Sequence, residues 1–471
     1  MTFQSGGGIS LQTRSCARSV VSQAEIHSYT YQYVLICPDL WHVVCPNNIS
    51  SIKASQFLNY RSLPFRVEHL PTTAGLADPS DMNTETIDRV RAAVNKQRLL
   101  DTAIALIEIP SPTRSAAVVA NRLEEILREE GFAVERAETA WPDSPSVIGR
   151  LDSGSPGRTL QMNGHLDTVH LDFIPPRVED GILYGSGCSD MKGGIASMVE
   201  AMRALRDADA LSAGSVLLTA HDLHETPWGD GSQVNALIEE GFLGDAVLLP
   251  EYFCKKLPVI GRGLSVLTVD IRREGEPVHE VLGGIEQPSV IGAGAEVVRR
   301  LAELDVALAK INDPMAGRES MFVGQIHSGE IFNQAPTELT LSGTRRWLPG
   351  TAMKDAEQQF HQILAEVAEQ RGVEIVGRFQ VARDAYELDR DHLFIEAFQS
   401  AHEATTGRRL EEGAKPFVDD GNAFVRQGNI PAITHGPDAK GAHTLNEEVP
   451  VDELVRVAQV YASTAICFCN T

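Results

Sequence analysis

Apolar residues recur at helical spacing in the first regular part of the chain. This pattern predicts helices over 85–107 and 115–130, with Gly131 as the end of the second. Apolar runs of strand length and one further helix follow: strands at 132–136, 146–151, 159–163 and 215–220, and a helix at 193–206. Strands that alternate with helices predict an α/β fold whose sheet is mostly parallel and covered on both faces.

The order of elements changes near Gly261. The pattern there predicts a strand at 264–274, a helix at 290–309, strands at 321–328 and 337–346, a helix at 353–371 and a strand at 374–382. This order indicates a separate α+β unit. We therefore expect one α/β domain in two parts, 83–263 and 384–471, with an inserted domain at 264–383.

Residues 1–82 differ from the rest of the chain. They show no sustained helical or strand period, and up to Asp81 they hold as many basic as acidic residues. A Ser/Arg-rich stretch at 13–23 is a weak match to a transit peptide. The simpler expectation is a poorly ordered, nonfunctional extension upstream of a natural start near Met82.

The charge balance bears on the partners of the protein. The chain has 41 Lys and Arg against 64 Asp and Glu, a formal net charge of −23 that repels phosphate backbones and anionic lipid. We expect no nucleic-acid or membrane partner, and no apolar run reaches the roughly 18 residues of a membrane span. Seven cysteines without CxxC spacing are typical of reduced thiols in a cytoplasmic protein.

Two short segments carry candidate metal chemistry. GHLDTVH at 164–170 follows a predicted strand, so His165 and Asp167 project to the same side. LYGSGCSDMKGG at 183–194 adds Asp190 among glycines that let backbone approach a ligand closely. Asp167 is placed either to orient the metal-binding imidazole or to hold a catalytic acid nearby. The two segments predict a metal-dependent hydrolase.

With these motifs, the chain from about Thr84 onward resembles the aminoacylase and carboxypeptidase G family of cocatalytic metallopeptidases. That family includes acetylornithine deacetylase and succinyl-diaminopimelate desuccinylase. The resemblance implies that the inserted domain is a ferredoxin-like lid and dimerisation domain, with a four-stranded antiparallel sheet and two helices. It also implies a homodimer that depends on a divalent metal, with Zn²⁺ favoured over Mn²⁺ or Co²⁺.

The resemblance also implies a set of metal ligands. In the family an aspartate bridges two ions, and each ion is completed by one histidine and one acidic residue. His165 and Asp190 match the first histidine and the bridge. Glu251 in AVLLPEYF matches the acidic ligand at the next strand end, and His443 in GPDAKGAHTLNEEV matches the second histidine.

The chain departs from the family between these positions. Members carry DEE, with the first glutamate as general base and the second as a metal ligand, whereas this chain reads HDLHETPWGDGS. In the favoured register Glu225 is the base and Thr226 replaces the anionic ligand, which weakens the second site. A shift by one makes Glu225 the ligand and His224 the base. His221 or His224 could instead supply a neutral ligand, so one or two ions per chain stay open.

Further residues match positions that contact the substrate. His279 in GEPVHEVLGG matches a lid histidine that reaches across to the other subunit and stabilises the oxyanion. Asn333 in IFNQAP and Arg346 in RRWLPG match lid positions that hold the carboxylate or backbone of the substrate. Asp420 in VDDGNAF matches an aspartate near the metal cleft. Trp228 either stacks on an aromatic substrate or packs within its loop.

Together these residues predict hydrolysis of the C–N bond of an N-acyl amino acid or a small peptide-like substrate. Glu225 would transfer the proton, with Asp167 and His279 as further catalytic residues. Two alternatives stay open. One is a mononuclear aminohydrolase that acts on an unusual C–N bond such as that of an aryl amine, and the other is an inactive binding or scaffold homologue.

Overall fold

The computed structural model of the protein describes residues 21–26, 29–37, 40–43, 84–138 and 140–470. The chain divides into two compact units, Met1–Asp78 and Pro79–Thr471.

Three strands form an antiparallel sheet in the N-terminal unit: β1 (Val21–Ile26), β2 (Tyr29–Cys37) and β3 (Leu40–Val43). Both β1 and β3 pair with β2. The sequence analysis did not predict these strands, although Tyr29, Tyr31 and Tyr33 of β2 alternate with polar residues. Their Tyr, Val and Ile residues also favour extended backbone. The remainder of the extension predicted at 1–82 lies outside the described residues.

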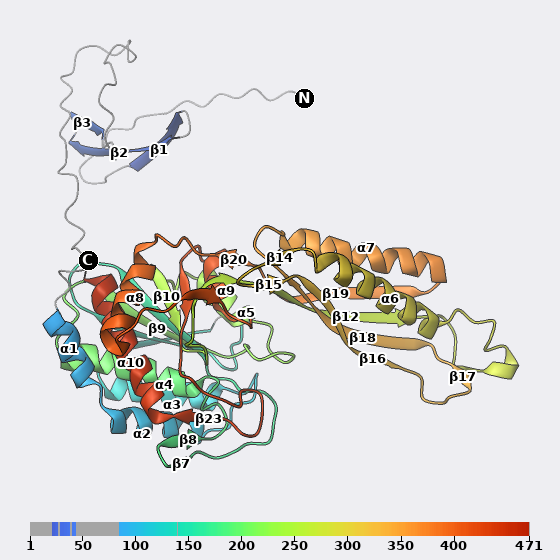
Figure 1. The fold of residues 1–471 in the computed structure, drawn as a ribbon, viewed down its shortest axis with the longest axis horizontal. Coiled ribbons are helices and arrows are strands. Elements are labelled where there is room, and N and C mark those ends of the chain that lie inside the picture. Colours follow the sequence, from blue (N-terminus) through green and yellow to red (C-terminus); the bar gives the residue numbers. More distant parts are fainter. Residues whose placement is uncertain (1–20, 27–28, 38–39, 44–83, 139, 471) are drawn as a thin grey trace, which may run out of the picture. The chain divides into compact units, whose positions relative to one another are not determined.

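A six-stranded sheet forms the centre of the second unit, in the order β22-β10-β6-β9-β5-β4 (Figure 1). Its strands are β4 (Ala133–Ala137), β5 (Ser146–Asp152), β6 (Thr159–His165), β9 (Ser215–His221), β10 (Ala246–Leu249) and β22 (Ala432–Thr434). The four strands from β22 to β9 run parallel, and β5 and β4 extend the sheet in antiparallel pairs. The predicted mostly parallel α/β sheet is confirmed.

Helices cover both faces of this sheet. They are α1 (Thr84–Ala93), α2 (Lys96–Ile107), α3 (Ala117–Glu129), α4 (Lys192–Asp207), α5 (Ser232–Glu239), α8 (Leu393–Thr406), α9 (Gly421–Arg426) and α10 (Val451–Cys469). Val216 and Leu218 of β9 pack in the large core cluster with α4 and α10. Leu217 points the other way and packs with Leu237 of α5. Burial on both faces explains why the strand is apolar at successive positions.

The single helix predicted over 85–107 is wrong, because the structure has two helices there, α1 and α2. Asn95 lies between them with extended backbone, and its side-chain oxygen accepts hydrogen bonds from the N–H groups of Gln97 and Arg98, each at 3.0 Å. Such a cap satisfies the N–H groups that begin a helix. Four polar residues in a row, 95–98, interrupt the apolar spacing at this break, and the Asn at their start is a typical helix N-cap, so the sequence carried a signal that the single-helix prediction overlooked.

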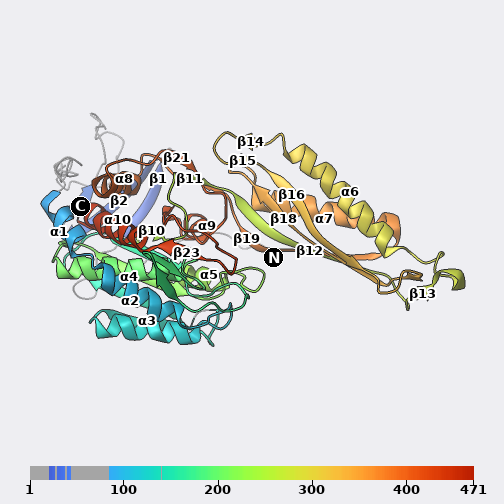
Figure 2. The same ribbon diagram turned by 60° about the horizontal axis from the view of Figure 1, so that its bottom comes forward.

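The inserted domain has the element order βαββαβ. Its elements are β12 (Gly263–Arg272), α6 (Val290–Leu308), β16 (Ser320–Ser328), β18 (Glu338–Trp347), α7 (Met353–Arg371) and β19 (Glu374–Arg383). The strands are all antiparallel, in the order β16-β18-β12-β19. Both helices run along this sheet (Figure 2) and share a core with alternate residues of β12, including Leu267 and Val269. This arrangement is the predicted ferredoxin-like fold.

Shorter elements complete the second unit. They are β7 (Arg177–Glu179), β8 (Ile182–Tyr184), β11 (Leu257–Gly261), β13 (Val278–His279), the 3₁₀ turn at Glu280–Leu282, β14 (Asn312–Asp313), β15 (Gly317–Arg318), β17 (Gln334–Ala335), β20 (Tyr386–Glu387), β21 (Glu412–Ala414) and β23 (Glu448–Pro450).

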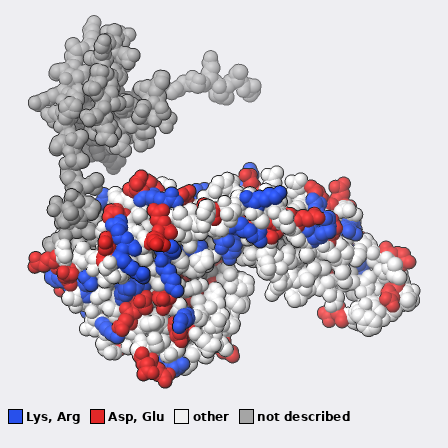
Figure 3. Space-filling model, viewed as in Figure 1, with Lys and Arg blue, Asp and Glu red and all other residues white. Residues whose placement is uncertain are grey.

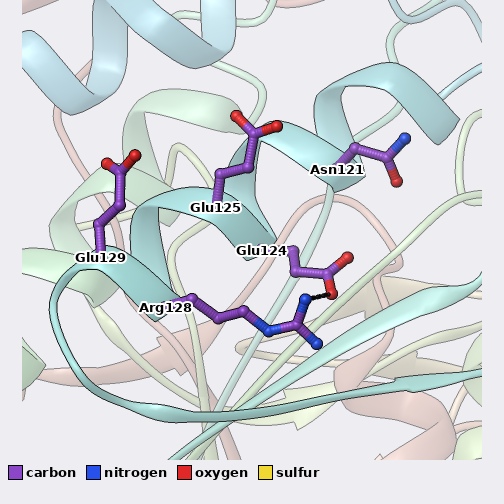
Figure 4. A pocket seen from close by; sticks show the side chains of 5 residues that line it. All are labelled: Asn121, Glu124, Glu125, Arg128 and Glu129. Atoms are coloured by element: carbon purple, nitrogen blue, oxygen red, sulfur yellow. Dashed lines mark ion pairs between the residues drawn. The ribbon is translucent and has the colours of Figure 1, made fainter.

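The surface carries charges of both signs. Basic and acidic side chains are interspersed over the face seen in Figure 3. A shallow pocket on α3 is lined by Asn121, Glu124, Glu125, Arg128 and Glu129, with Arg128 paired to Glu124 (Figure 4). These side chains come from one helix and include none of the predicted site residues. Within the described residues, no helix is long and apolar enough to cross a lipid bilayer.

Candidate active site

The candidate residues lie together at the carboxyl ends of three parallel strands. Strand β6 ends at His165, its neighbour β9 ends at His221, and Glu251 follows β10 by two residues. Parallel neighbours end at the same edge of a sheet, which is where α/β folds place their sites. The altered segment after β9 therefore lies beside the HxD motif after β6.

His165 faces two of the predicted acidic ligands. Its ring is fully buried, with Nε2 3.2 Å from Oδ1 of Asp190 and 3.7 Å from Oε1 of Glu251. Its Nδ1 lies 2.9 Å from the backbone carbonyl oxygen of Asp167. An Nδ1–H that donates to this carbonyl leaves the Nε2 lone pair directed at the carboxylates.

Asp190 lies between two imidazoles. Its Oδ1 faces His165, and its Oδ2 lies 3.2 Å from Nε2 of His443. The same nitrogen of His443 lies 3.1 Å from Oε2 of Glu225. The structure thus brings together the residues predicted as first histidine, bridge, second histidine and base.

Glu447 positions the loop of Asp190, a role that the sequence analysis missed. Its carboxylate accepts hydrogen bonds from the N–H groups of Gly187, Ser189 and Asp190, at 2.9, 3.1 and 3.2 Å, and from the Ser189 hydroxyl at 2.8 Å. The signal was present as the NE pair that follows AHTL in the His443 motif.

Asp420 contacts two histidines of the altered segment. Its Oδ2 lies 3.0 Å from Nδ1 of His224 and 3.0 Å from Nε2 of His221. The His224 ring is stacked on that of His165, with 4.0 Å between the centroids and 4° between the planes. The sequence placed Asp420 near the metal cleft, and the structure shows that its neighbours there are imidazoles.

The carboxylate of Asp167 holds the altered segment by accepting hydrogen bonds from the backbone of that segment. Its Oδ2 accepts hydrogen bonds from the N–H groups of His224 and Glu225, at 3.1 and 3.0 Å, and from the Thr113 hydroxyl at 2.9 Å. These contacts correspond to holding the candidate catalytic acid, and the 2.9 Å approach of the Asp167 carbonyl oxygen to Nδ1 of His165 corresponds to the other predicted role, orienting the metal-binding imidazole. No sequence motif pointed to Thr113.

The electrostatics of the cluster indicate a cation site. Burial and the charge of Asp190 raise the pKa of Glu251 well above its ordinary value. Hydrogen bonds to Asp190 and Glu225 raise the pKa of His443 to about 10. Although burial opposes it, His165 and His443 hold the pKa of Asp190 well below its ordinary value.

The donor set fits a divalent metal ion. Two groups of three have their ligand atoms within 4.8 Å of one another: His165, His224 and Glu251, and His165, Asp190 and Glu225. Among the described residues, no lysine or arginine forms an ion pair with Asp190, Glu225 or Glu251. Buried carboxylates need compensating charge, and oxygen and imidazole donors together suit a divalent ion.

The segment after Glu225 contains two further candidate residues, Thr226 and Trp228. Thr226 is half-buried and has a neutral hydroxyl where the family resemblance implies an anionic ligand. The Trp228 ring stacks on His170, with centroids 4.1 Å apart and 5° between the planes. His170 Nε2 lies 3.0 Å from the carbonyl oxygen of Thr113. Trp228 therefore has a packing partner within the loops around the site.

The three candidate residues of the inserted domain lie apart from the cluster. His279 Nε2 accepts a hydrogen bond from the Asn333 amide at 2.9 Å, and Arg346 lies on β18. Burial lowers the pKa of Arg346. In the part of the chain that the structure describes, no hydrogen bond or ion pair joins these residues to the ligand cluster.

Buried imidazoles and carboxylates at the carboxyl ends of parallel strands define the class of the protein as a metal-dependent hydrolase. The sequence profile of peptidase family M20/M25/M40 matches residues 162–466, and the chain belongs to this family. The family resemblance drawn from the motifs is confirmed. The protein is an enzyme, a metal-dependent hydrolase of amide bonds.

Relatives span most of the chain. N-formyl-4-amino-5-aminomethyl-2-methylpyrimidine deformylase of Bacillus subtilis is 23% identical over 428 residues, 80% of this chain and 96% of the relative. Succinyl-diaminopimelate desuccinylase of Delftia acidovorans is 26% identical over 394 residues, 78% and 97% of the two chains.

Solved structures share the fold. Aminopeptidase PepT of Bacillus cereus has a TM-score of 0.64 at 18% identity, covering 80% of this chain and 99% of the other. Human carnosine dipeptidase 1 has a TM-score of 0.65 at 14% identity, covering 82% and 98%. These neighbours support the predicted architecture.

Proposed function

We propose that the enzyme hydrolyses an N-acyl amino acid or a small peptide-like substrate at the cluster around Asp190. The observation that carries the proposal is the placement of this carboxylate, with one oxygen 3.2 Å from His165 and the other 3.2 Å from His443. The names of the two relatives, a deformylase and a desuccinylase, support removal of an acyl group from nitrogen.

His165, Asp190 and Glu251 are proposed to hold the first ion, and Asp190 and His443 a weaker second one. Zn²⁺ is favoured because imidazole suits zinc, with Co²⁺ or Mn²⁺ as the alternatives. When bound, a divalent ion polarises the substrate carbonyl and acidifies water.

Glu225 is proposed as the general base. Its carboxylate is buried among the proposed ligands. Its backbone N–H donates a hydrogen bond of 3.0 Å to Oδ2 of Asp167, which holds the residue in place. From there Glu225 takes a proton from the attacking water and delivers it to the leaving nitrogen. The 3.1 Å contact with His443 also suits the shifted register, in which Glu225 is a ligand of the second ion.

The number of metal ions bound per chain distinguishes the register with Glu225 as base from the one with Glu225 as ligand. With Thr226 in place of an anionic ligand, we expect about one firmly held ion per chain after desalting, measured by elemental analysis. Thr226→Glu should raise occupancy of the second site, whereas the neutral isostere Thr226→Gln should not. Two tightly held ions in the wild-type chain would favour Glu225 as a ligand.

Arg346 and Asn333 are proposed to bind the carboxylate or backbone of the substrate. The Nη1 atom of Arg346 is buried and has no hydrogen-bond partner among the described residues. A guanidinium group with a free donor suits a carboxylate. Trp228 is proposed to shape the cleft, with His170 supporting its ring.

We further propose a homodimer formed by the inserted domain. Among the described strands, β16 lies at the edge of its sheet and pairs only with β18. Phe322 and Ile326 on this strand are 62% and 48% exposed, although both are apolar. An open edge with exposed apolar residues favours pairing with another strand. His279 would then act across the subunit boundary on the oxyanion.

A mixed dimer tests the cross-subunit role of His279. His279→Ala and Glu225→Ala chains should each be inactive alone, because each homodimer lacks one residue at every site. A mixed dimer holds one intact site, so mixing should restore up to about half of the activity per mixed dimer. Mixed dimers verified by differential tags but without activity would contradict the proposal.

A cytoplasmic location is proposed from cysteine chemistry. The described cysteines, Cys188, Cys254, Cys467 and Cys469, are all free thiols. Burial raises the pKa values of Cys188 and Cys467, which makes these thiols poor nucleophiles.

A substrate screen with metal-reconstituted enzyme tests the proposed function. N-formyl, N-acetyl and N-succinyl amino acids and dipeptides should be turned over. Turnover of aryl amines alone would favour the mononuclear aminohydrolase. A fully metallated chain without any turnover would favour the scaffold alternative.

A further inference from the structure

His224 lies where an imidazole can reach the proposed first ion. Its ring is parallel to that of His165, with the centroids 4.0 Å apart. The Nε2 atoms of His165 and His224 lie 3.7 and 3.8 Å from the same atom, Oε1 of Glu251. Two imidazoles and a carboxylate therefore converge on one point.

The outer nitrogen of each ring is held by an oxygen. Nδ1 of His165 lies 2.9 Å from the carbonyl oxygen of Asp167, and Nδ1 of His224 lies 3.0 Å from Oδ2 of Asp420. A metal-binding histidine usually donates its second N–H to a carboxylate or carbonyl, which leaves the lone pair on the other nitrogen. Both Nε2 lone pairs then face Glu251.

His221 differs from His224 because both of its ring nitrogens are engaged. Nε2 lies 3.0 Å from Oδ2 of Asp420, and Nδ1 lies 3.0 Å from the carbonyl oxygen of Asp222. His221 therefore has no ring nitrogen left for a metal ion. It acts on the site only by holding Asp420 against His224.

We infer that His224 is a further ligand of the first ion and that Asp420 positions its imidazole. The inference rests on the proposed function, because it requires the first ion at His165 and Glu251. Ligand atoms of these three residues lie within 4.8 Å of one another. The ion then has two imidazole nitrogens where the family resemblance implies one.

The added nitrogen changes which metal the site prefers. Imidazole suits zinc and copper, whereas carboxylate and water suit manganese and magnesium. With Asp190 and Glu251, the proposed first ion has two imidazoles and two carboxylates, and both donor types are ligands that zinc accepts. The site should prefer Zn²⁺ over Mn²⁺, and the first ion should bind without help from the second.

Metal affinity tests this assignment. Zn²⁺ and Mn²⁺ are titrated into the metal-free full chain against a chromophoric chelator, for wild type and for His224→Gln. We expect His224→Gln to lose more than about 100-fold in Zn²⁺ affinity, beyond the about 10- to 100-fold of an outer-shell change. The Mn²⁺ affinity of His224→Gln should fall by a smaller factor than its Zn²⁺ affinity. The ratio of Zn²⁺ affinity to Mn²⁺ affinity should therefore be lower than in the wild type.

Two further variants give matched controls. Asp420→Asn should weaken Zn²⁺ by about 10- to 100-fold, as expected for an outer-shell partner. His221→Gln removes the other histidine that contacts Asp420, and Zn²⁺ affinity should fall by less than about 10-fold. Zn²⁺ affinity within threefold of wild type for His224→Gln would overturn the inference.

X-ray absorption of the wild-type chain with one equivalent of Zn²⁺ provides a measurement that needs no variant. Two imidazoles per zinc are expected, and one would overturn the inference. His165→Ala separates this failure from a failure of the proposed function. If His165→Ala loses zinc but His224→Gln keeps it, only the His224 assignment is wrong. If His165→Ala also keeps zinc, the proposed first site is wrong as well.

Discussion

Replacing His165 by Ala should abolish turnover and remove the firmly bound metal. The imidazole is fully buried, and its Nε2 faces both Asp190 and Glu251. Without it, two buried carboxylates lose the neutral donor between them, and their mutual repulsion disfavours the ordered site. Metal affinity should fall by more than about 100-fold, since even an outer-shell change costs about 10- to 100-fold.

Elemental analysis and kcat/KM measured on the same preparation test this expectation. His361→Ala is a matched control, because His361 is half-buried on α7 of the inserted domain and lies outside the ligand cluster. The control should keep wild-type metal content and activity. A His165→Ala chain with full metal and turnover would show that the first ion lies elsewhere.

Replacing Glu225 by Gln should separate catalysis from metal binding. The amide keeps the shape of the side chain and cannot take a proton, so kcat should fall by about 10²- to 10⁴-fold. Metal content and folding should be retained, because the backbone hydrogen bond from Glu225 to Asp167 does not involve the carboxylate of Glu225. The measurements are kcat, KM and bound metal.

Glu239→Gln is the matched control for this change, since Glu239 is exposed at the end of α5. It should leave all three quantities unchanged. If Glu225→Gln loses an ion together with its activity, the carboxylate is a ligand. The shifted register, in which Glu225 is a ligand and His224 is the base, would then hold.

Local pattern was a sound guide to the elements of the second unit. The strands ending at His165 and His221 and the helix after Asp190 lie within two residues of their predicted bounds. Apolar periodicity is set by which face a residue buries, so it survives in the sequence. The prediction failed at Asn95, where a polar run at 95–98 begins with the side chain that caps a new helix.

Motif spacing identified most residues of the cluster but could not assign a role to each of them. His165, Asp190, Glu251 and His443 were all expected, and the structure brings all four together. The roles of His221 and His224 stayed open, because the two residues are only three positions apart and of the same type. Their difference depends on Asp420 and Asp222, which occupy opposite sides of His221.

The amino-acid sequence alone specified the order of the elements over 115–220, the inserted domain and the chemical types of the candidate ligands. All three follow from local periodicity and from short motifs. The tertiary structure decided which ring nitrogen faces the site and which carboxylate holds it. The contact between His224 and Asp420 joins residues 196 positions apart. Such a contact forms only when β9 and the start of α9 meet in the folded chain, and neither segment signals the other in the sequence.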